Sequence, residues 1–160
     1  MFGNRVTLFK LLGFEVKLDS SWIILAVLIT WSLAKGIFPA YYEDMPAANY
    51  WAMGVAGAAG LFLSIIFHEL SHSLVARRFG IPMKGITLFI FGGVAEMSEE
   101  PPSAKAEFLT AIIGPVSSLL IAAAFYGLLQ AGESAGWPAA VNGVLFYLVW
   151  VNVVLALFNL

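Results

Sequence analysis

The sequence predicts a membrane protein that is mainly α-helical, with four transmembrane helices, short strands at the N-terminus and a β-hairpin after the second helix. Three observations support this fold class. The 160 residues are 61% hydrophobic and only 11% charged, unlike an ordinary soluble domain. The apolar residues are concentrated in four stretches, and about 20 such residues suffice to cross the hydrocarbon core of a bilayer. Between these stretches lie runs with the alternation or the β-branched content of strands.

The first 21 residues are expected to form a segment of short strands. Residues 6–9 are mostly apolar, and residues 14–18 alternate apolar and polar side chains, as a half-buried strand does. The first transmembrane helix is predicted to cover residues 22–38, which is at the short end of the length that a span needs. It begins with Trp22, a residue type that favours the membrane interface.

Three further stretches are long enough to be transmembrane helices. They cover residues 51–75, 108–129 and 139–160. The second helix carries small residues between Gly54 and Gly60, which permit close contact with another helix; a passage for water is the less favoured alternative. In the third helix Pro115 removes a helical hydrogen bond, and Ser117 and Ser118 are expected to bond the backbone groups that it frees.

The basic residues predict the orientation in the membrane. Seven of the eight lie before the first helix or between the second and the third, and only Lys35 lies on the other side. The seven are Arg5, Lys10, Lys17, Arg77, Arg78, Lys84 and Lys105. Because cytoplasmic loops carry an excess of Lys and Arg, we expect the N-terminus and the loop after the second helix to be cytoplasmic. The expected location is therefore the cell membrane, with the lipid bilayer around a multi-pass protein.

The composition excludes several classes of function. The chain has no cysteine, so disulfide and thiol chemistry are excluded. Its net charge is −2 and it has no basic patch, so no nucleic-acid partner is expected. A cleavable signal peptide is not expected, because the N-terminus is polar and the first apolar run starts late. The oligomeric state does not follow from these observations.

The second helix contains His68-Glu69-Leu70-Ser71-His72, an H-E-x-x-H motif. Residues four apart lie on one face of a helix, so His68 and His72 can direct two imidazoles at one zinc ion, with Glu69 beside them as a general base. A satisfied pair of core histidines is the alternative interpretation. It is disfavoured because a charged residue at the centre of a span costs about 2.5–3.5 kcal/mol. The ligands precede Arg77 by five and nine residues, which places them roughly 7–14 Å below the headgroups and inside the membrane.

A hairpin is predicted in the loop between the second and the third helix. Residues 86–91 are β-branched and aromatic, and Gly92-Gly93 separates them from residues 94–97. A Gly-Gly pair between two such runs is typical of a hairpin turn. Two roles stay open: a simple cover for the site, or a strand edge that binds an extended substrate. The second role makes Phe91, Gly92 and Gly93 candidates for substrate binding.

Two asparagines lie in the fourth helix. Asparagine in a span usually bonds a neighbouring helix, and this is the expectation for Asn152. Asn159 could instead donate to an oxyanion, and it is a candidate for substrate binding.

These motifs together resemble those of the site-2 proteases, the intramembrane zinc metalloproteases of peptidase family M50. The matching segments are His68 to His72, Phe91 to Met97, Glu107-Phe108, Gly114-Pro115 and Phe158-Asn159-Leu160. The opening, from Phe14 to Trp22, resembles the prokaryotic branch that often carries C-terminal CBS domains. The resemblance covers essentially the whole chain, residues 1–160, as an intramembrane metalloprotease core.

The resemblance implies a zinc-dependent endopeptidase that cleaves transmembrane segments of membrane proteins in regulated intramembrane proteolysis. It implies zinc ligation by His68 and His72 and activation of a zinc-bound water by Glu69. The implied substrates are single-span membrane proteins, such as anti-sigma factors or membrane-held transcription regulators. The competing hypothesis is an inactive scaffold or a transporter-like fragment without hydrolase activity.

The resemblance also implies a third zinc ligand, the aspartate of a Leu-Asp-Gly sequence a few residues after the position of Asn159. The given sequence ends at Leu160, before this motif. We therefore expect a core that is truncated at its C-terminus and lacks the third ligand, so that activity belongs to the complete enzyme. A Leu-Asp-Gly sequence downstream would favour the protease over the scaffold.

Overall fold

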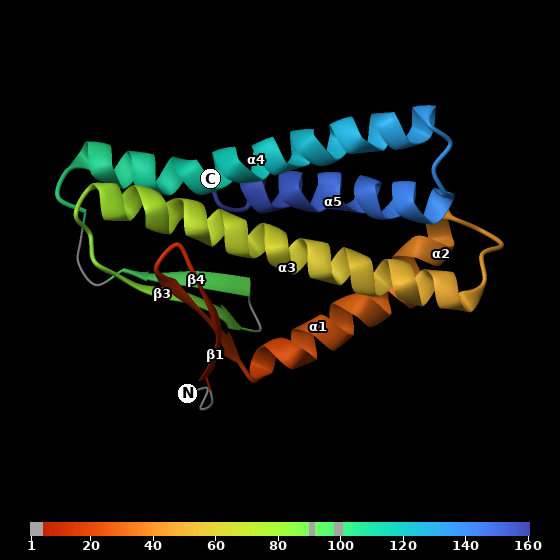
Figure 1. The fold of residues 1–160 in the computed structure, drawn as a ribbon, viewed down its shortest axis with the longest axis horizontal. Coiled ribbons are helices and arrows are strands. Elements are labelled where there is room, and N and C mark those ends of the chain that lie inside the picture. Colours follow the sequence, from red (N-terminus) through yellow and green to blue (C-terminus); the bar gives the residue numbers. More distant parts are fainter. Residues whose placement is uncertain (1–4, 90–91, 98–100) are drawn as a thin grey trace.

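The computed structural model describes residues 5–89, 92–97 and 101–160, and within them four long helices and a small sheet (Figure 1). The elements are β1 (Arg5–Leu11), β2 (Phe14–Asp19), α1 (Ser21–Ser32), a π-helical turn (Leu33–Ile37), α2 (Phe38–Tyr41), α3 (Ala47–Arg78), β3 (Met83–Phe89), β4 (Gly92–Met97), α4 (Ala104–Ser134) and α5 (Ala139–Leu157). The predicted fold class is confirmed.

Among the described residues, four continuous helical segments are long and apolar enough to cross a membrane: Ser21–Tyr41, Ala47–Arg78, Ala104–Ser134 and Ala139–Leu157. The second and third exceed the predicted ranges 51–75 and 108–129, because the helical backbone continues into polar flanks. Ser103 is the N-cap of α4, because its side chain accepts a hydrogen bond from the backbone N–H of Ala106. Many large apolar side chains on these helices are exposed, as expected of a multi-pass membrane protein that faces lipid.

Helix α3 is the centre of the molecule. Figure 1 shows α4 and α5 along one side of α3, with α1 and the sheet on the other, and each of these elements contacts α3. Between α3 and the sheet lies a core that includes Val16, Phe62, Ile65 and Leu88. Because its neighbours lie on two sides, α3 buries more residues than any other described span.

The four strands form one sheet in the order β1-β2-β3-β4. Strands β1 and β2 form an antiparallel hairpin, and so do β3 and β4, but β2 pairs with β3 in parallel, with Val16 beside Ile86 and Leu18 beside Leu88. The sequence predicts strands at both positions but does not predict that they pair with each other. Strand β3 is therefore paired on both sides.

The Gly92-Gly93 pair is not the turn of the hairpin, and this part of the prediction was wrong. Both glycines begin β4, where Gly92 pairs with Phe89 and Gly93 with Leu88. Position 93 of the strand needs a glycine for a steric reason: a Cβ there would lie 2.8 Å from Cγ2 of Ile65 in α3. Only a strand without a side chain at this position can approach the helix so closely.

The β1–β2 hairpin is fastened to the end of α3. Its two-residue turn has positive φ at Leu12 and Gly13, which suits the twist of a tight hairpin. Nη1 of Arg77 donates to the carbonyl oxygen of Leu12 at 2.8 Å, and its guanidinium lies 4.7 Å from the ring centre of Phe14. Arg77 therefore joins the last turn of α3 to the N-terminal strands.

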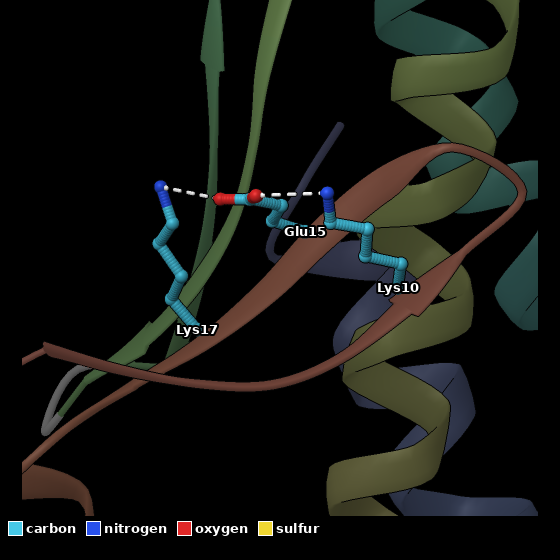
Figure 2. Close-up of polar contacts among 3 residues, drawn as sticks. All are labelled: Lys10, Glu15 and Lys17. Carbon is cyan, nitrogen blue, oxygen red and sulfur yellow. Dashed lines mark ion pairs between the residues drawn. The ribbon is translucent and has the colours of Figure 1, made fainter.

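An ion-pair cluster lies on the exposed face of the same hairpin. Figure 2 shows the carboxylate of Glu15 between two lysines, with Lys10 Nζ at 3.3 Å and Lys17 Nζ at 3.2 Å. The hydrogen bond from Lys17, followed by that from Lys10, lowers the pKa of the Glu15 carboxyl. Exposed pairs of this kind contribute little stability.

Candidate metal centre

The two histidines of the H-E-x-x-H motif lie on one face of α3 and converge. Their ring centres are 4.8 Å apart, and Nε2 of His68 lies 3.1 Å from Nε2 of His72. His68 is only 1% exposed, and His72 is partly buried. The i, i+4 spacing therefore produces the arrangement that the sequence predicted.

The other nitrogen of each ring bonds to α4. Nδ1 of His72 lies within hydrogen-bonding distance of the backbone carbonyl oxygen of Thr110, and Nδ1 of His68 lies 2.8 Å from Oγ of Ser118. A carbonyl oxygen can only accept, so Nδ1 of His72 carries the hydrogen and its Nε2 keeps a free lone pair. A neutral imidazole of this tautomer is a metal ligand.

Gly114 lets α4 approach the two rings. A Cβ at this position would lie 2.6 Å from Nε2 of His68 and closer still to Nε2 of His72. Any other residue would place an atom in the space that both nitrogens face. The absence of a side chain at Gly114 thus keeps open a cradle beside the two converging Nε2 atoms.

These features fit a zinc ion. Zinc–nitrogen bonds of 2.0–2.1 Å in a tetrahedral site put two ligand nitrogens roughly 3.3 Å apart, close to the separation of the two Nε2 atoms. The described residues contain no group of three or more His, Cys, Asp or Glu side chains that could hold a metal. The two histidines could therefore provide two of the three protein ligands that a catalytic zinc site normally has.

Glu69 lies between the histidines in the sequence and faces the sheet. It is partly buried, and a Cβ on Gly93 would lie 2.9 Å from its Cγ. The structure thus brings the candidate base next to one candidate for substrate binding. Gly92 lies one residue earlier in β4, and Phe91 is outside the described residues.

Asn159 is not brought to the histidines by any described contact. It is exposed just after the end of α5, and its Nδ2 donates to the carbonyl oxygen of Leu155 at 2.7 Å. Asn152, by contrast, confirms the expectation of an interhelical bond: its Nδ2 donates to Oγ of Ser64 in α3 at 2.9 Å.

Sequence reasoning missed the part that α4 plays in the site. Ser117 does bond its own backbone, donating to the carbonyl oxygen of Gly114 at 2.7 Å, but Ser118 bonds His68 instead. The sequence did carry a signal for this role of α4. Thr110, Gly114 and Ser118 follow at four-residue intervals and therefore share one face of the helix.

Known proteins resemble this chain closely. The sequence model described as peptidase family M50 matches residues 56–136. "Putative zinc metalloprotease Rip3" of Mycobacterium tuberculosis is 39% identical over 157 residues, covering 98% of this chain and 40% of that protein. "Zinc metalloprotease MJ0392" of Methanocaldococcus jannaschii is 31% identical over 157 residues, covering 97% of this chain and 40% of that protein. The chain thus spans about 40% of the length of these relatives.

A solved structure has the same fold. The site-2 protease from Methanocaldococcus jannaschii matches with a TM-score of 0.63 and 27% sequence identity, over 97% of this chain and 63% of that chain. The region matched by the family model contains the H-E-x-x-H motif and the face of α4 that contacts it. Taken with the two converging histidines inside a spanning helix, these matches show that the chain belongs to peptidase family M50, the family of the site-2 proteases.

Proposed function

We propose that the complete protein is a zinc-dependent intramembrane endopeptidase that cleaves transmembrane segments of other membrane proteins. The observation that carries this proposal is the convergence of two Nε2 atoms, 3.1 Å apart, from a buried and a partly buried histidine in the C-terminal third of a helix that is long and apolar enough to span a membrane. Ionisable groups in such a place are functional candidates because they are costly to insert. The names of the relatives as zinc metalloproteases support the same reaction and lend no support to the scaffold or transporter hypothesis.

The residues have separate roles in this proposal. His68 and His72 would hold zinc through Nε2, and the family resemblance implies an aspartate as the third protein ligand. Bound zinc would polarise the scissile carbonyl and make water more acidic. Glu69 would take a proton from the attacking water and return it to the amine that leaves when the peptide bond breaks.

The substrate would bind as an extended strand at the outer edge of β4. The sequence left open whether a strand edge of this hairpin binds substrate, and because β3 is paired on both sides, that edge cannot belong to β3. Among the described strands, β4 pairs only with β3, and Gly93 places it beside Glu69. A photo-crosslinker at position 95 should capture substrate, whereas one at the buried Thr87 should not. Equal capture at both positions would remove β4 as the docking edge.

The proposed orientation has the N-terminus and the loop after α3 in the cytoplasm. The chain has no cysteine, so single cysteines at the exposed Glu43 and Pro82 would be labelled selectively. An impermeant thiol reagent on intact cells should label the cysteine at position 43 and spare the one at position 82. The reverse pattern would overturn the orientation.

The replacement Glu69→Gln tests the mechanism in the complete enzyme. Glutamine keeps the shape of the side chain but cannot accept the proton, so turnover should fall by at least about 10²–10⁴-fold while zinc is retained. Glu133→Gln, an exposed change at the far end of α4, is the matched control and should be neutral. His68→Ala should lose zinc.

Two outcomes would contradict the assignment of Glu69. Loss of zinc from Glu69→Gln would make this residue a ligand or a structural group. Cleavage near the normal rate with zinc retained would mean that another group activates the water.

A further inference from the structure

We propose that Ser118 is a positioning residue for the metal centre: its hydroxyl accepts the Nδ1–H of His68 and so directs the Nε2 lone pair of that ring at zinc. The inference deepens the proposed function and rests on it. Its basis is a contact between α3 and α4 that joins residues 50 positions apart, with Oγ of Ser118 2.8 Å from Nδ1 of His68.

The two ligand histidines are held by different kinds of acceptor. The partner of His72 is the backbone carbonyl of Thr110, which can only accept and therefore permits one tautomer of a neutral ring. The partner of His68 is a hydroxyl, which can donate or accept. A hydroxyl belongs to a side chain, so the acceptor at His68 can be removed by substitution while the backbone acceptor at His72 remains.

Burial makes the hydroxyl of Ser118 hard to replace. Ser118 is 0% exposed and His68 is 1% exposed, so bulk water has no access to either partner of this hydrogen bond. If the hydroxyl is removed, the Nδ1–H of the zinc-bound ring is left buried without an acceptor, which costs about 1–3 kcal/mol. The same loss frees the ring to rotate away from the geometry in which the two Nε2 atoms converge.

The placement of Ser118 on α4 supports a specific role. It lies four residues after Gly114, the position that admits no Cβ beside the two rings, and eight after Thr110. One face of α4 thus supplies the acceptor for each ligand and the open space between them. Ser117, the next residue back, donates to its own helix at the carbonyl of Gly114 and does not contact the histidines through any described bond.

The test compares Ser118→Ala with Ser117→Ala in the full-length protein, purified in detergent. Zinc affinity is measured by competition with a chromophoric chelator, without any substrate. Outer-shell partners of a metal-bound histidine contribute about 10–100-fold to affinity, so Ser118→Ala should weaken binding by that factor. Ser117→Ala, which removes a neighbouring hydroxyl from the same turn, should stay within about twofold of the unmodified protein, since it contacts no ligand.

A conservative variant and a spectroscopic signal separate positioning from simple packing. Ser118→Thr keeps the hydroxyl, so affinity should return toward that of the unmodified protein, whereas a pure packing role would leave it as weak as in Ser118→Ala. In the zinc-loaded protein with ¹⁵N-labelled histidine, Ser118→Ala should shift the Nδ1–H resonance of His68 and leave that of His72 in place. This measurement remains decisive if the threonine variant does not fold.

Failure of this inference differs from failure of the proposed function. If the unmodified full-length protein binds no zinc, the proposed function itself falls. If it binds zinc and Ser118→Ala binds it equally well with an unshifted His68 resonance, the positioning role of Ser118 is overturned while the zinc enzyme stands.

Discussion

Helix α3 makes two buried polar contacts one turn apart, and they have different consequences. At Ser64 the partner is Asn152 of α5, and at His68 the partner is Ser118 of α4. All four residues are at most 2% exposed. By composition and burial alone the two contacts would be equal candidates for a function inside the membrane.

The difference lies in where the polar atoms point. The hydroxyl of Ser64 donates to the carbonyl of Gly60 in its own helix. Nδ2 of Asn152 donates to Oγ of Ser64 and to the carbonyl of Leu148. The side-chain donors of this contact therefore all have acceptors within α3 and α5. At the histidines only the Nδ1 atoms bond to α4, and the two Nε2 atoms face one another. A contact whose donors are all bonded joins helices, whereas one that leaves two ring nitrogens converging can bind a metal.

The largest expected effect comes from filling the space beside the converging nitrogens. Gly114→Ala places a Cβ 2.6 Å from Nε2 of His68, so either the rings or α4 must move. Overpacking of this kind costs about 1–3 kcal/mol in stability. We expect loss of stoichiometric zinc from the complete protein, measured by elemental analysis after gel filtration.

The control for this change is on the same helix. A Cβ on Gly127 meets no atom within 4 Å, so Gly127→Ala should retain zinc and leave stability unchanged or raised by up to about 1 kcal/mol through helix propensity. Full zinc retention in Gly114→Ala would show that the approach of α4 is not needed to form the site.

An intermediate effect is expected at the contact between α3 and α5. Asn152→Ala removes the bonds to Ser64 and Leu148, and interhelical hydrogen bonds in membranes contribute on average about 0.6 kcal/mol. We expect a destabilisation of this order, measured by titrating the purified protein with a denaturing detergent, and unchanged zinc affinity. A change in affinity as large as that of Ser118→Ala would abolish the distinction between the two contacts.

The smallest effect is expected far from both contacts, at Glu15. Lys17 and Lys10 lower the pKa of this carboxyl below its ordinary value of 4.5 in the folded protein. The stabilisation is therefore present above about pH 4.5 and disappears as the pH falls through the folded pKa. Glu15→Gln should remove this small pH-dependent difference, measured as the shift in unfolding midpoint between pH 6 and pH 3 at low salt. A difference that grows as the pH falls would contradict the assigned sign.

By itself the sequence predicted the spans, and it gave the proposed ligand pair and the proposed base. Membrane insertion depends on the length and apolarity of a segment, and both can be counted along the chain. The convergence of His68 and His72 follows from the repeat of a single helix, so it needs no knowledge of neighbouring elements. Glu69 was identified for the same local reason.

Only the tertiary structure decided what surrounds these residues. The parallel pairing of β2 with β3, the place of Gly93 in β4 beside Glu69, and the hydrogen bond between His68 and Ser118 all join segments that are distant in the sequence. A strand-like run predicts a strand but not its partner, and a serine in a helix can bond its own backbone or another element. Which of these occurs depends on how closely two elements approach, and here the glycines at positions 93 and 114 decide that approach.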